Sequence, residues 1–149
     1  MRTIKYIVVH CSATPQDATV QSILDYWKNI LKWKNPGYHY IIKPSGEIVQ
    51  LLDEDKPSNG VAGYNSQSVN ICYIGGIMAN GKPVDNRTEE QKAAMCFLLQ
   101  QLKGRYPKAT IRGHRDFSPD LNGNGVIEPF EWIKHCPCFD AKEEYKNIK

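Results

Sequence analysis

The sequence predicts a single α/β domain in which helices flank a central mixed β-sheet. Three observations lead to this fold class. β-Forming stretches alternate with stretches of helical periodicity, two β-rich runs around a turn predict a hairpin, and no repeat or low-complexity segment divides the 149 residues. A chain of this length buries a core without disulfide staples, and 41% hydrophobic with 23% charged residues is typical of a globular domain. We therefore expect one domain spanning residues 1–149.

The first half of the chain is expected to hold a strand, a helix and a hairpin. Residues 4–10 form a near-continuous run of β-forming side chains, which predicts a buried strand. Apolar residues recur at helical spacing over residues 19–34, and Asn35-Pro36-Gly37 is expected to end that helix. Two β-rich runs within residues 38–52 flank a turn at residues 43–46, and this pattern predicts the hairpin.

The second half is expected to hold a short strand at residues 71–74, a second helix and a last strand at residues 110–112. The sequence Thr88-Glu89-Glu90-Gln91 has the pattern of a helix capping box, so the helix should begin there. Its buried stripe is predicted to consist of Met95, Leu98, Leu99, Leu102 and Tyr106. The last strand would deliver His114 at its end, and residues 53–60 and 75–86 are expected to be loops.

Composition and charge exclude several classes of protein. The net charge of +3 comes with no basic stripe, so we expect no nucleic-acid binding. Five scattered cysteines without a CxxC pair favour reduced thiols over a disulfide framework. No apolar run approaches the ~18 residues of a membrane span, so no membrane insertion is expected. The first 15 residues lack the pattern of a secretory signal, and we expect cytoplasmic synthesis without a signal peptide.

Two histidines are expected at the ends of strands. His10 ends the first predicted strand and His114 follows the last, so rigid elements would position both. Neutral imidazole and thiolate are good zinc ligands, and a catalytic zinc takes three protein ligands and leaves one position for water. His10, His114 and one cysteine of Cys136-Pro137-Cys138 would meet that requirement. The long spacing is no local zinc signature, and a single histidine is more often a packed or surface residue.

Five motifs occur in order over nearly the whole chain: IVVHCSAT, GYHYIIKPSG, GYNSQSVNICYIGG, GHRD and KHCPCFD. Together they resemble the zinc-dependent N-acetylmuramoyl-L-alanine amidases, the family of the short phage lysozymes and the peptidoglycan recognition proteins. The resemblance implies zinc ligation by His10, His114 and Cys136. It favours Cys136 over Cys138, because the family pattern has a serine-like residue at the latter position. It also implies catalytic roles for Tyr38 and Lys134.

The chemistry of amide hydrolysis agrees with these implied roles. Zinc lowers the pKa of a bound water from 15.7 to about 7. Lys134 could stabilise the oxyanion of the tetrahedral intermediate, and Tyr38 could orient the water or relay a proton to the leaving nitrogen. Without the resemblance, Tyr38 would be interpreted as strand packing and Lys134 as a solvated side chain.

The resemblance implies a substrate and a setting. The substrate would be the amide bond between N-acetylmuramic acid and L-alanine in bacterial peptidoglycan. A chain of this size resembles a phage or prophage endolysin, a monomer that acts on the cell wall after release. A host autolysin, or an effector delivered by another route, is the alternative setting. Two alternative functions also remain open: a peptidoglycan-binding module without catalysis, and a protein in which four closed ligands make zinc purely structural.

Substrate contacts and neighbouring polar residues are less defined by the sequence. Related amidases often carry a histidine shortly before their GYN tripeptide, and residues 58–62 have none. The remaining polar candidates on that loop are Tyr64, Asn65 and Ser66. Asp116 is expected either to orient His114 or to cap a loop. His39 is expected to be packed or hydrogen-bonded, and His135 to be exposed.

Residues 120–131 match the twelve-residue calcium loop of an EF-hand. Oxygen donors fall at positions 1, 3 and 5, glycine at position 6 and glutamate at position 12. The predicted ligands are Asp120, Asn122, Asn124, the carbonyl of Val126 and Glu131. No amphipathic helix leads into the loop, so a glycine-rich polar turn is the alternative. The affinity of such a site for calcium would be low, and the bound ion would rigidify the segment that carries Lys134 and Cys136.

Overall fold

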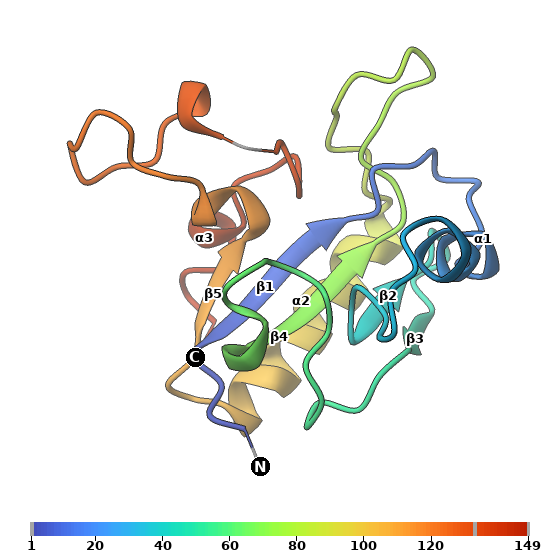
Figure 1. Ribbon diagram of the computed structural model, residues 1–149, viewed down its shortest axis with the longest axis horizontal. Coiled ribbons are helices and arrows are strands. Elements are labelled where there is room, and N and C mark those ends of the chain that lie inside the picture. The colour runs from blue at the N-terminus through green and yellow to red at the C-terminus, as the bar shows by residue number, and fades with distance from the viewer. Residues whose placement is uncertain (1, 133, 149) are drawn as a thin grey trace.

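Five strands form one mixed sheet in the computed structural model, which describes residues 2–132 and 134–148. The strands are β1 (Tyr6–Cys11), β2 (Tyr40–Ile42), β3 (Ile48–Gln50), β4 (Ser68–Tyr73) and β5 (Thr110–Gly113). Their spatial order is β3-β2-β4-β1-β5 (Figure 1). β1 pairs in parallel with β4 and β5, β2 pairs in parallel with β4, and β3 is the antiparallel partner of β2. The predicted mixed sheet of an α/β domain and its hairpin are confirmed.

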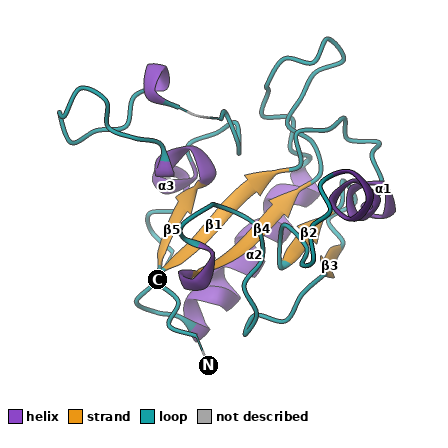
Figure 2. Ribbon diagram, in the orientation of Figure 1, coloured by secondary structure: helices purple, strands orange, loops and turns teal. Residues whose placement is uncertain are grey.

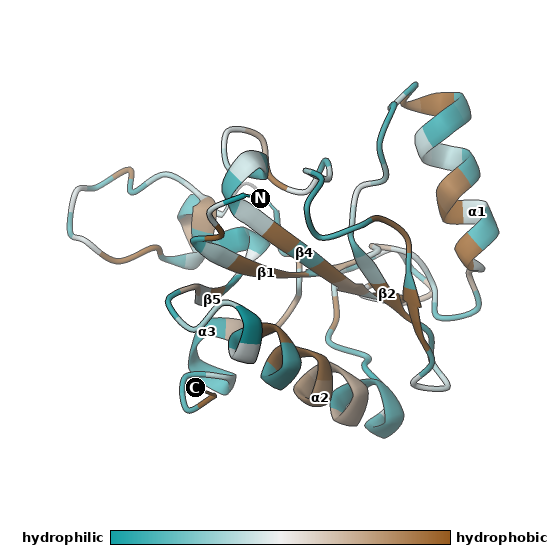
Figure 3. Ribbon diagram, turned by 90° about the horizontal axis from the view of Figure 1, so that it is seen from below, coloured by the Kyte–Doolittle hydropathy of each residue, from teal (hydrophilic) through white to brown (hydrophobic). Residues whose placement is uncertain are grey.

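Helical segments cover the two faces of the sheet. They are α1 (Val20–Asp25) continuing into the π-helical turn η1 (Tyr26–Ile30), α2 (Glu89–Arg105), α3 (Ala141–Glu144), and the short 3-10 turns η2 (Asn65–Gln67), η3 (His114–Phe117) and η4 (Pro129–Glu131). Seen from below, α2 lies on one side of the strands and α1 on the other (Figure 3). No helix among the described residues is long and apolar enough to cross a bilayer.

Strand alternation separates a large apolar core from a face that carries polar groups. Ile7 and Val9 of β1 belong to the apolar cluster that also contains Met95 and Leu99 of α2. A smaller cluster on the α1 side contains Trp27 and the β-strand residue Ile41. Successive side chains of a strand point to opposite faces, so His10 of β1 lies on the face away from Ile7 and Val9.

The predicted capping box of the long helix is confirmed. Thr88 Oγ1 accepts a hydrogen bond from the Gln91 backbone N–H at 3.0 Å, and the Thr88 N–H donates to Gln91 Oε1 at 3.0 Å. The fully buried Gln91 also donates from Nε2 to the carbonyls of Ile42 and Ile74. One side chain therefore starts α2 and ties it to the ends of two strands.

The predicted end of the first helix is wrong. The helical segment stops at Ile30, short of residue 34, because Lys32 adopts a left-handed conformation with φ of 58°. The Trp33 N–H then reaches back to the Trp27 carbonyl at 2.9 Å, a closing bond that usually follows a glycine. The strand predicted at residues 71–74 also begins earlier, at Ser68, and α3 was not predicted.

Candidate metal centre and cleft

Parallel pairing of β1 with β5 brings the two predicted histidine ligands together. His10 lies near the end of β1, and His114 follows β5 directly, so both lie at the carboxyl edge of neighbouring strands. The long loops of the molecule gather at this edge (Figure 2). The Nδ1 atoms of the two rings are 3.2 Å apart.

Cys136 approaches the same point from the C-terminal segment. Its Sγ accepts a hydrogen bond from the Cys11 N–H at 3.1 Å, and its carbonyl accepts from the Arg115 N–H at 2.9 Å. A Cβ at Gly113 would lie 2.7 Å from the ring of Pro137, so only glycine lets this segment cross β5 closely. Ligand atoms of His10, His114 and Cys136 all lie within 4.8 Å of one another.

These three residues fit a zinc ion. Two nitrogen ligands of a tetrahedral zinc lie about 3.3 Å apart, given Zn–N bonds of about 2.0–2.1 Å, and the observed separation of the Nδ1 atoms is 3.2 Å. The Nε2 of His10 is bonded to Asn70 Oδ1 at 2.8 Å, which leaves Nδ1 free to bind a cation. Three protein ligands of nitrogen and sulfur leave one position for water, as in catalytic zinc sites.

Burial keeps both imidazoles in the neutral form that ligation requires. Desolvation lowers the pKa of His10 well below its usual value, and the neighbouring His114 lowers it further. Burial, with a smaller effect of the Lys134 charge, lowers the pKa of His114 to about 4. Neither ring carries a charge at neutral pH, so neither must lose a proton before binding a metal.

Tyr38 and Lys134 border the same centre. The Tyr38 ring lies 4.8 Å from the His10 ring, centroid to centroid, and its hydroxyl donates to the Cys11 carbonyl at 3.3 Å. Burial raises the pKa of Tyr38 above its usual range, so its hydroxyl stays a proton donor at neutral pH. Lys134 is exposed and shares two cavities with His114.

A cleft extends to both sides of the metal centre. One cavity, of about 710 Å³, runs from Cys136 and Tyr38 to side chains of α1 and η1. The other, of about 460 Å³, runs toward the loop before η2 and toward η3. Both share the residues Trp33, Asn59, Gly60, His114 and Lys134. The centre therefore lies where two open grooves meet.

Comparison with known proteins agrees with this geometry. The sequence pattern of the N-acetylmuramoyl-L-alanine amidases matches residues 1–126, most of the chain. The chain belongs to the N-acetylmuramoyl-L-alanine amidase family. This amidase therefore hydrolyses the amide bond between N-acetylmuramic acid and L-alanine in peptidoglycan. The match ends before Lys134 and Cys136, so these two are placed at the centre by the structure.

Two phage proteins and one solved structure are similar to the amidase. The endolysin of Enterobacteria phage K11 is 39% identical over 140 residues, 93% of this chain and 83% of the phage protein. The endolysin of Klebsiella phage KP32 is 38% identical over 138 residues, 91% and 82% of the two chains. The structure of the amidase LysC from Clostridium intestinale matches with a TM-score of 0.74 at 20% identity, covering 99% of this chain and 88% of LysC. The last likeness shows the fold.

The alternative third ligand, Cys138, lies outside the metal group. Its Sγ donates to the Gly76 carbonyl at 3.4 Å and lies 3.8 Å from the Cys11 Sγ. Among the described residues, the set with Cys136 is the one group of three or more His, Cys, Asp or Glu side chains close enough to share an ion. The geometry favours Cys136.

Three neighbouring polar residues take structural positions. Asp116 caps the turn after β5, since its Oδ2 accepts from the Gly113 N–H at 2.8 Å. His39 is fully buried and its Nδ1 accepts from the Asn70 N–H at 2.9 Å. His135 is exposed. The expectations for His39 and His135 are confirmed, and Asp116 follows the loop-cap alternative.

The substrate candidates on the GYN loop divide into two groups. Tyr64 and Asn65 line the smaller cavity of the cleft. Asn65 Oδ1 also accepts from the Val61 N–H at 2.8 Å, so this side chain shapes its own loop. Ser66 is exposed and lines neither cavity of the cleft. The substrate roles of all three remain predictions.

In the predicted calcium loop, carboxylate oxygens accept hydrogen bonds from backbone N–H groups of the same loop. The Asp120 carboxylate accepts from the N–H groups of Gly123 and Gly125. The buried Glu131 carboxylate accepts from the N–H groups of Leu121, Asn122 and Glu128. These bonds satisfy the carboxylates without an ion, and no comparison supports calcium. Calcium ligation by Asp120, Asn122, Asn124, Val126 and Glu131 remains a prediction.

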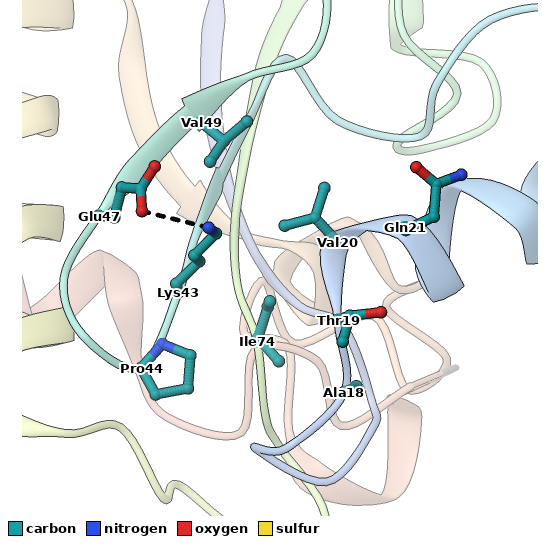
Figure 4. A pocket seen from close by; sticks show the side chains of 9 residues that line it. All are labelled: Ala18, Thr19, Val20, Gln21, Lys43, Pro44, Glu47, Val49 and Ile74. Atoms are coloured by element: carbon teal, nitrogen blue, oxygen red, sulfur yellow. Dashed lines mark hydrogen bonds and ion pairs between the residues drawn. The ribbon is translucent and has the colours of Figure 1, made fainter.

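Another cavity, of about 580 Å³, lies between α1 and the β2–β3 hairpin (Figure 4). Its charged lining residues, Lys43 and Glu47, form an ion pair with each other at 3.1 Å. None of the metal-ligand candidates lines it. We therefore assign the chemistry to the cleft.

Sequence reasoning missed the polar residues behind His10. Asn70 and Ser58 are buried and hydrogen-bonded to each other, and Asn70 contacts the His10 ring directly. The available signal was an asparagine inside the β-forming run of residues 69–74. A polar residue there must either reach solvent or find a buried partner.

Proposed function

We propose that the amidase is a zinc enzyme that serves as an endolysin. The observation that carries this proposal is the convergence of His10, His114 and Cys136 on one point of a cleft that Tyr38 and Lys134 also line. The endolysins of phages K11 and KP32 support the biological role, since each aligns with more than nine-tenths of this chain. All five residues come from one chain, so the site needs no residue from a second copy, and we propose that the enzyme acts as a monomer.

The proposed ligands are two histidine nitrogens and one cysteine sulfur. His10 and His114 offer neutral Nδ1 atoms from rigid strand ends, and Cys136 offers a sulfur held by the Cys11 N–H. Zinc in this site supplies a Lewis acid and lowers the pKa of a water from 15.7 to about 7. His10, His114 and Cys136 would fill three positions of a tetrahedral zinc, and the fourth would be available to water.

Lys134 and Tyr38 act on the substrate. Lys134 places a positive charge beside His114 at the junction of the two grooves, where it stabilises the oxyanion that develops on the amide carbonyl. Tyr38 keeps its proton and presents a hydroxyl next to His10, where it orients water or passes a proton to the leaving nitrogen.

The two-sided cleft suits a substrate that continues in both directions from the bond that is cut. The larger groove exposes aromatic side chains of Tyr26 and Trp33 beside the centre. The smaller groove offers the polar groups of Tyr64 and Asn65. Peptidoglycan extends as a glycan on one side of the amide and as a peptide on the other, which matches a cleft open at both ends.

A single comparison on purified cell wall tests the proposal. The zinc-loaded protein, the chelator-treated protein and a Cys136→Ala variant are incubated with peptidoglycan, and new N-terminal L-alanine is measured. The loaded protein alone should release it, and added zinc should restore the chelated sample. Cys138→Ala is the matched control and should retain activity. Release of reducing sugar ends in place of amino groups would contradict the amidase mechanism.

A further inference from the structure

A chain of buried hydrogen bonds leads from the metal ligand His10 to the backbone on the far side of β4. His10 Nε2 lies 2.8 Å from Asn70 Oδ1, and Asn70 Nδ2 donates to Ser58 Oγ at 2.7 Å. Ser58 Oγ lies 3.3 Å from His39 Nδ1, and His39 Nε2 lies 2.6 Å from the Lys56 carbonyl. All four side chains are at most 1% exposed, so water cannot replace any of these bonds.

Two backbone groups determine which nitrogen of His39 carries the proton. A carbonyl can only accept, so the Lys56 oxygen requires an N–H at His39 Nε2. A backbone N–H can only donate, and the N–H of Asn70 points at His39 Nδ1 from 2.9 Å. Arg2 Nη2 also lies 3.2 Å from His39 Nε2, but it donates to the Glu54 carbonyl. His39 is therefore neutral, with its lone pair on Nδ1.

That lone pair sets the direction of the remaining bonds. The Ser58 hydroxyl, 3.3 Å from His39 Nδ1, is the second and longer donor to the lone pair that the Asn70 backbone N–H also shares. Ser58 thereby keeps its own lone pairs for the Asn70 amide N–H. The Asn70 amide is thus oriented with nitrogen toward Ser58 and oxygen toward His10. A flipped amide would take the Ser58 proton and leave the Ser58–His39 bond unmade.

We propose that Asn70 is a positioning residue that holds His10 as the Nε2–H tautomer and aims its Nδ1 lone pair at the metal. The inference rests on the proposed zinc function and names the residues that tune one ligand of that site. Gly60 makes room for the arrangement, since a Cβ there would lie 2.3 Å from the Asn70 Oδ1 and Cγ atoms. Ser58 and His39 continue this hydrogen-bonded relay behind Asn70. Asn70, Ser58 and His39 are neither proposed ligands of the ion nor proposed contacts of the substrate.

Three substitutions test the relay. Asn70→Leu keeps the approximate volume and removes the acceptor, Asn70→Asp keeps an acceptor for His10, and Ser58→Ala removes the group that orients the amide. Val69→Ala is the control, because Val69 is buried on the neighbouring position of β4 and faces the α2 side of the sheet. Zinc affinity is measured by competition with a chromophoric chelator. The His10 tautomer is read in the metal-free protein from the ¹⁵N shifts of its ring.

The wild-type protein should show His10 as the Nε2–H tautomer before any metal is added. Asn70→Leu should lose that preference and bind zinc about 10–100-fold more weakly, as removal of a ligand's hydrogen-bond partner typically does. Asn70→Asp should retain both the tautomer preference and the zinc affinity. Ser58→Ala should give values between those of the wild type and Asn70→Leu, and Val69→Ala should change neither.

An unchanged tautomer and unchanged zinc affinity in Asn70→Leu would overturn the proposal. If that variant does not fold, the same two readouts in Ser58→Ala decide the question. A wild-type protein that binds no zinc would contradict the proposed function. The tautomer measurement would still stand, because it is made on the metal-free protein.

Discussion

Replacing Cys136 and Cys138 by serine, one at a time, tests the assignment of Cys136 as the third zinc ligand. Cys136 and Cys138 lie two residues apart, and serine replaces sulfur with oxygen at nearly the same volume. The Cys136 Sγ lies within 4.8 Å of the ligand nitrogens of both histidines. The Cys138 Sγ contacts the Gly76 carbonyl and the Cys11 Sγ instead. Cys138→Ser is therefore a matched control for Cys136→Ser.

The expected effect can be worked out as a shift in melting temperature. At free zinc 100 times the wild-type Kd, binding stabilises the folded state by about 2.7 kcal/mol. Loss of one of three ligands should weaken binding on the order of 100-fold, at least as much as loss of a hydrogen bond to a ligand. Stabilisation at the same zinc concentration then falls to about 0.4 kcal/mol. A difference of about 2.3 kcal/mol lowers the zinc-induced rise in Tm by about 5–9 °C in a domain of this size.

Calorimetry in a zinc buffer measures this rise for each protein as the Tm with zinc minus the Tm with chelator. Comparing each variant with its own metal-free form removes any direct effect of the substitution on stability. Cys136→Ser should lose most of the rise and Cys138→Ser should keep it. The reverse result would move the ligand to Cys138, and an undiminished rise in both variants would refute ligation by either cysteine.

Other parts of the molecule give predictions of different kinds. Lys134→Ala should lower kcat on the order of 10²–10³-fold and leave the zinc-induced rise in Tm unchanged, because the lysine stabilises the oxyanion and binds no ion. Calcium should raise the Tm, and Glu131→Gln should abolish that rise; no rise in the intact protein would remove the predicted site. Arg87→Met should lower the free energy of unfolding, measured in urea, on the order of 2 kcal/mol. The Arg87 side chain is 2% exposed and pairs with Asp85 and Glu144, whose exposure of 31% and 43% keeps the loss below that of a fully buried pair. Hydrogen bonds from Arg87 hold the pKa of Glu144 below its usual value, so this carboxylate stabilises the fold above its unfolded pKa of about 4.3. That contribution should disappear as pH falls through the folded pKa, and urea titrations from pH 5 to 3 should show a smaller decline in Arg87→Met.

The sequence correctly predicted those structural elements that are determined by a few residues adjacent in the chain. The capping box at Thr88 located the start of α2, and two β-rich runs around the turn at residues 43–46 located the hairpin. The end of the first helix was missed because Lys32, a residue that disfavours positive φ, takes the place that glycine usually holds. β4 was predicted too short because Asn70 interrupts its apolar run, and that asparagine is satisfied only by partners far away in the sequence.

The site itself was predicted only with the help of the resemblance. His10 and His114 are 104 residues apart, and no local spacing says that their strands are neighbours. Propensity also says nothing about which sulfur of Cys136-Pro137-Cys138 turns toward the histidines. That choice depends on the Cys11 N–H and on the close crossing at Gly113, which are both tertiary contacts.

The metal centre depends on strand order more than on any one loop. β1 lies between β4 and β5, so His10 receives a second ligand from β5 on one side and its hydrogen-bond partner from β4 on the other. A strand at the edge of the sheet would have only one neighbour and could not be supported in both ways. The Cys136 segment then needs only to cross the end of β5, where Gly113 leaves it room. The position of β1 between the strand that leads to His114 and the strand that carries Asn70 therefore accounts for both contacts of His10.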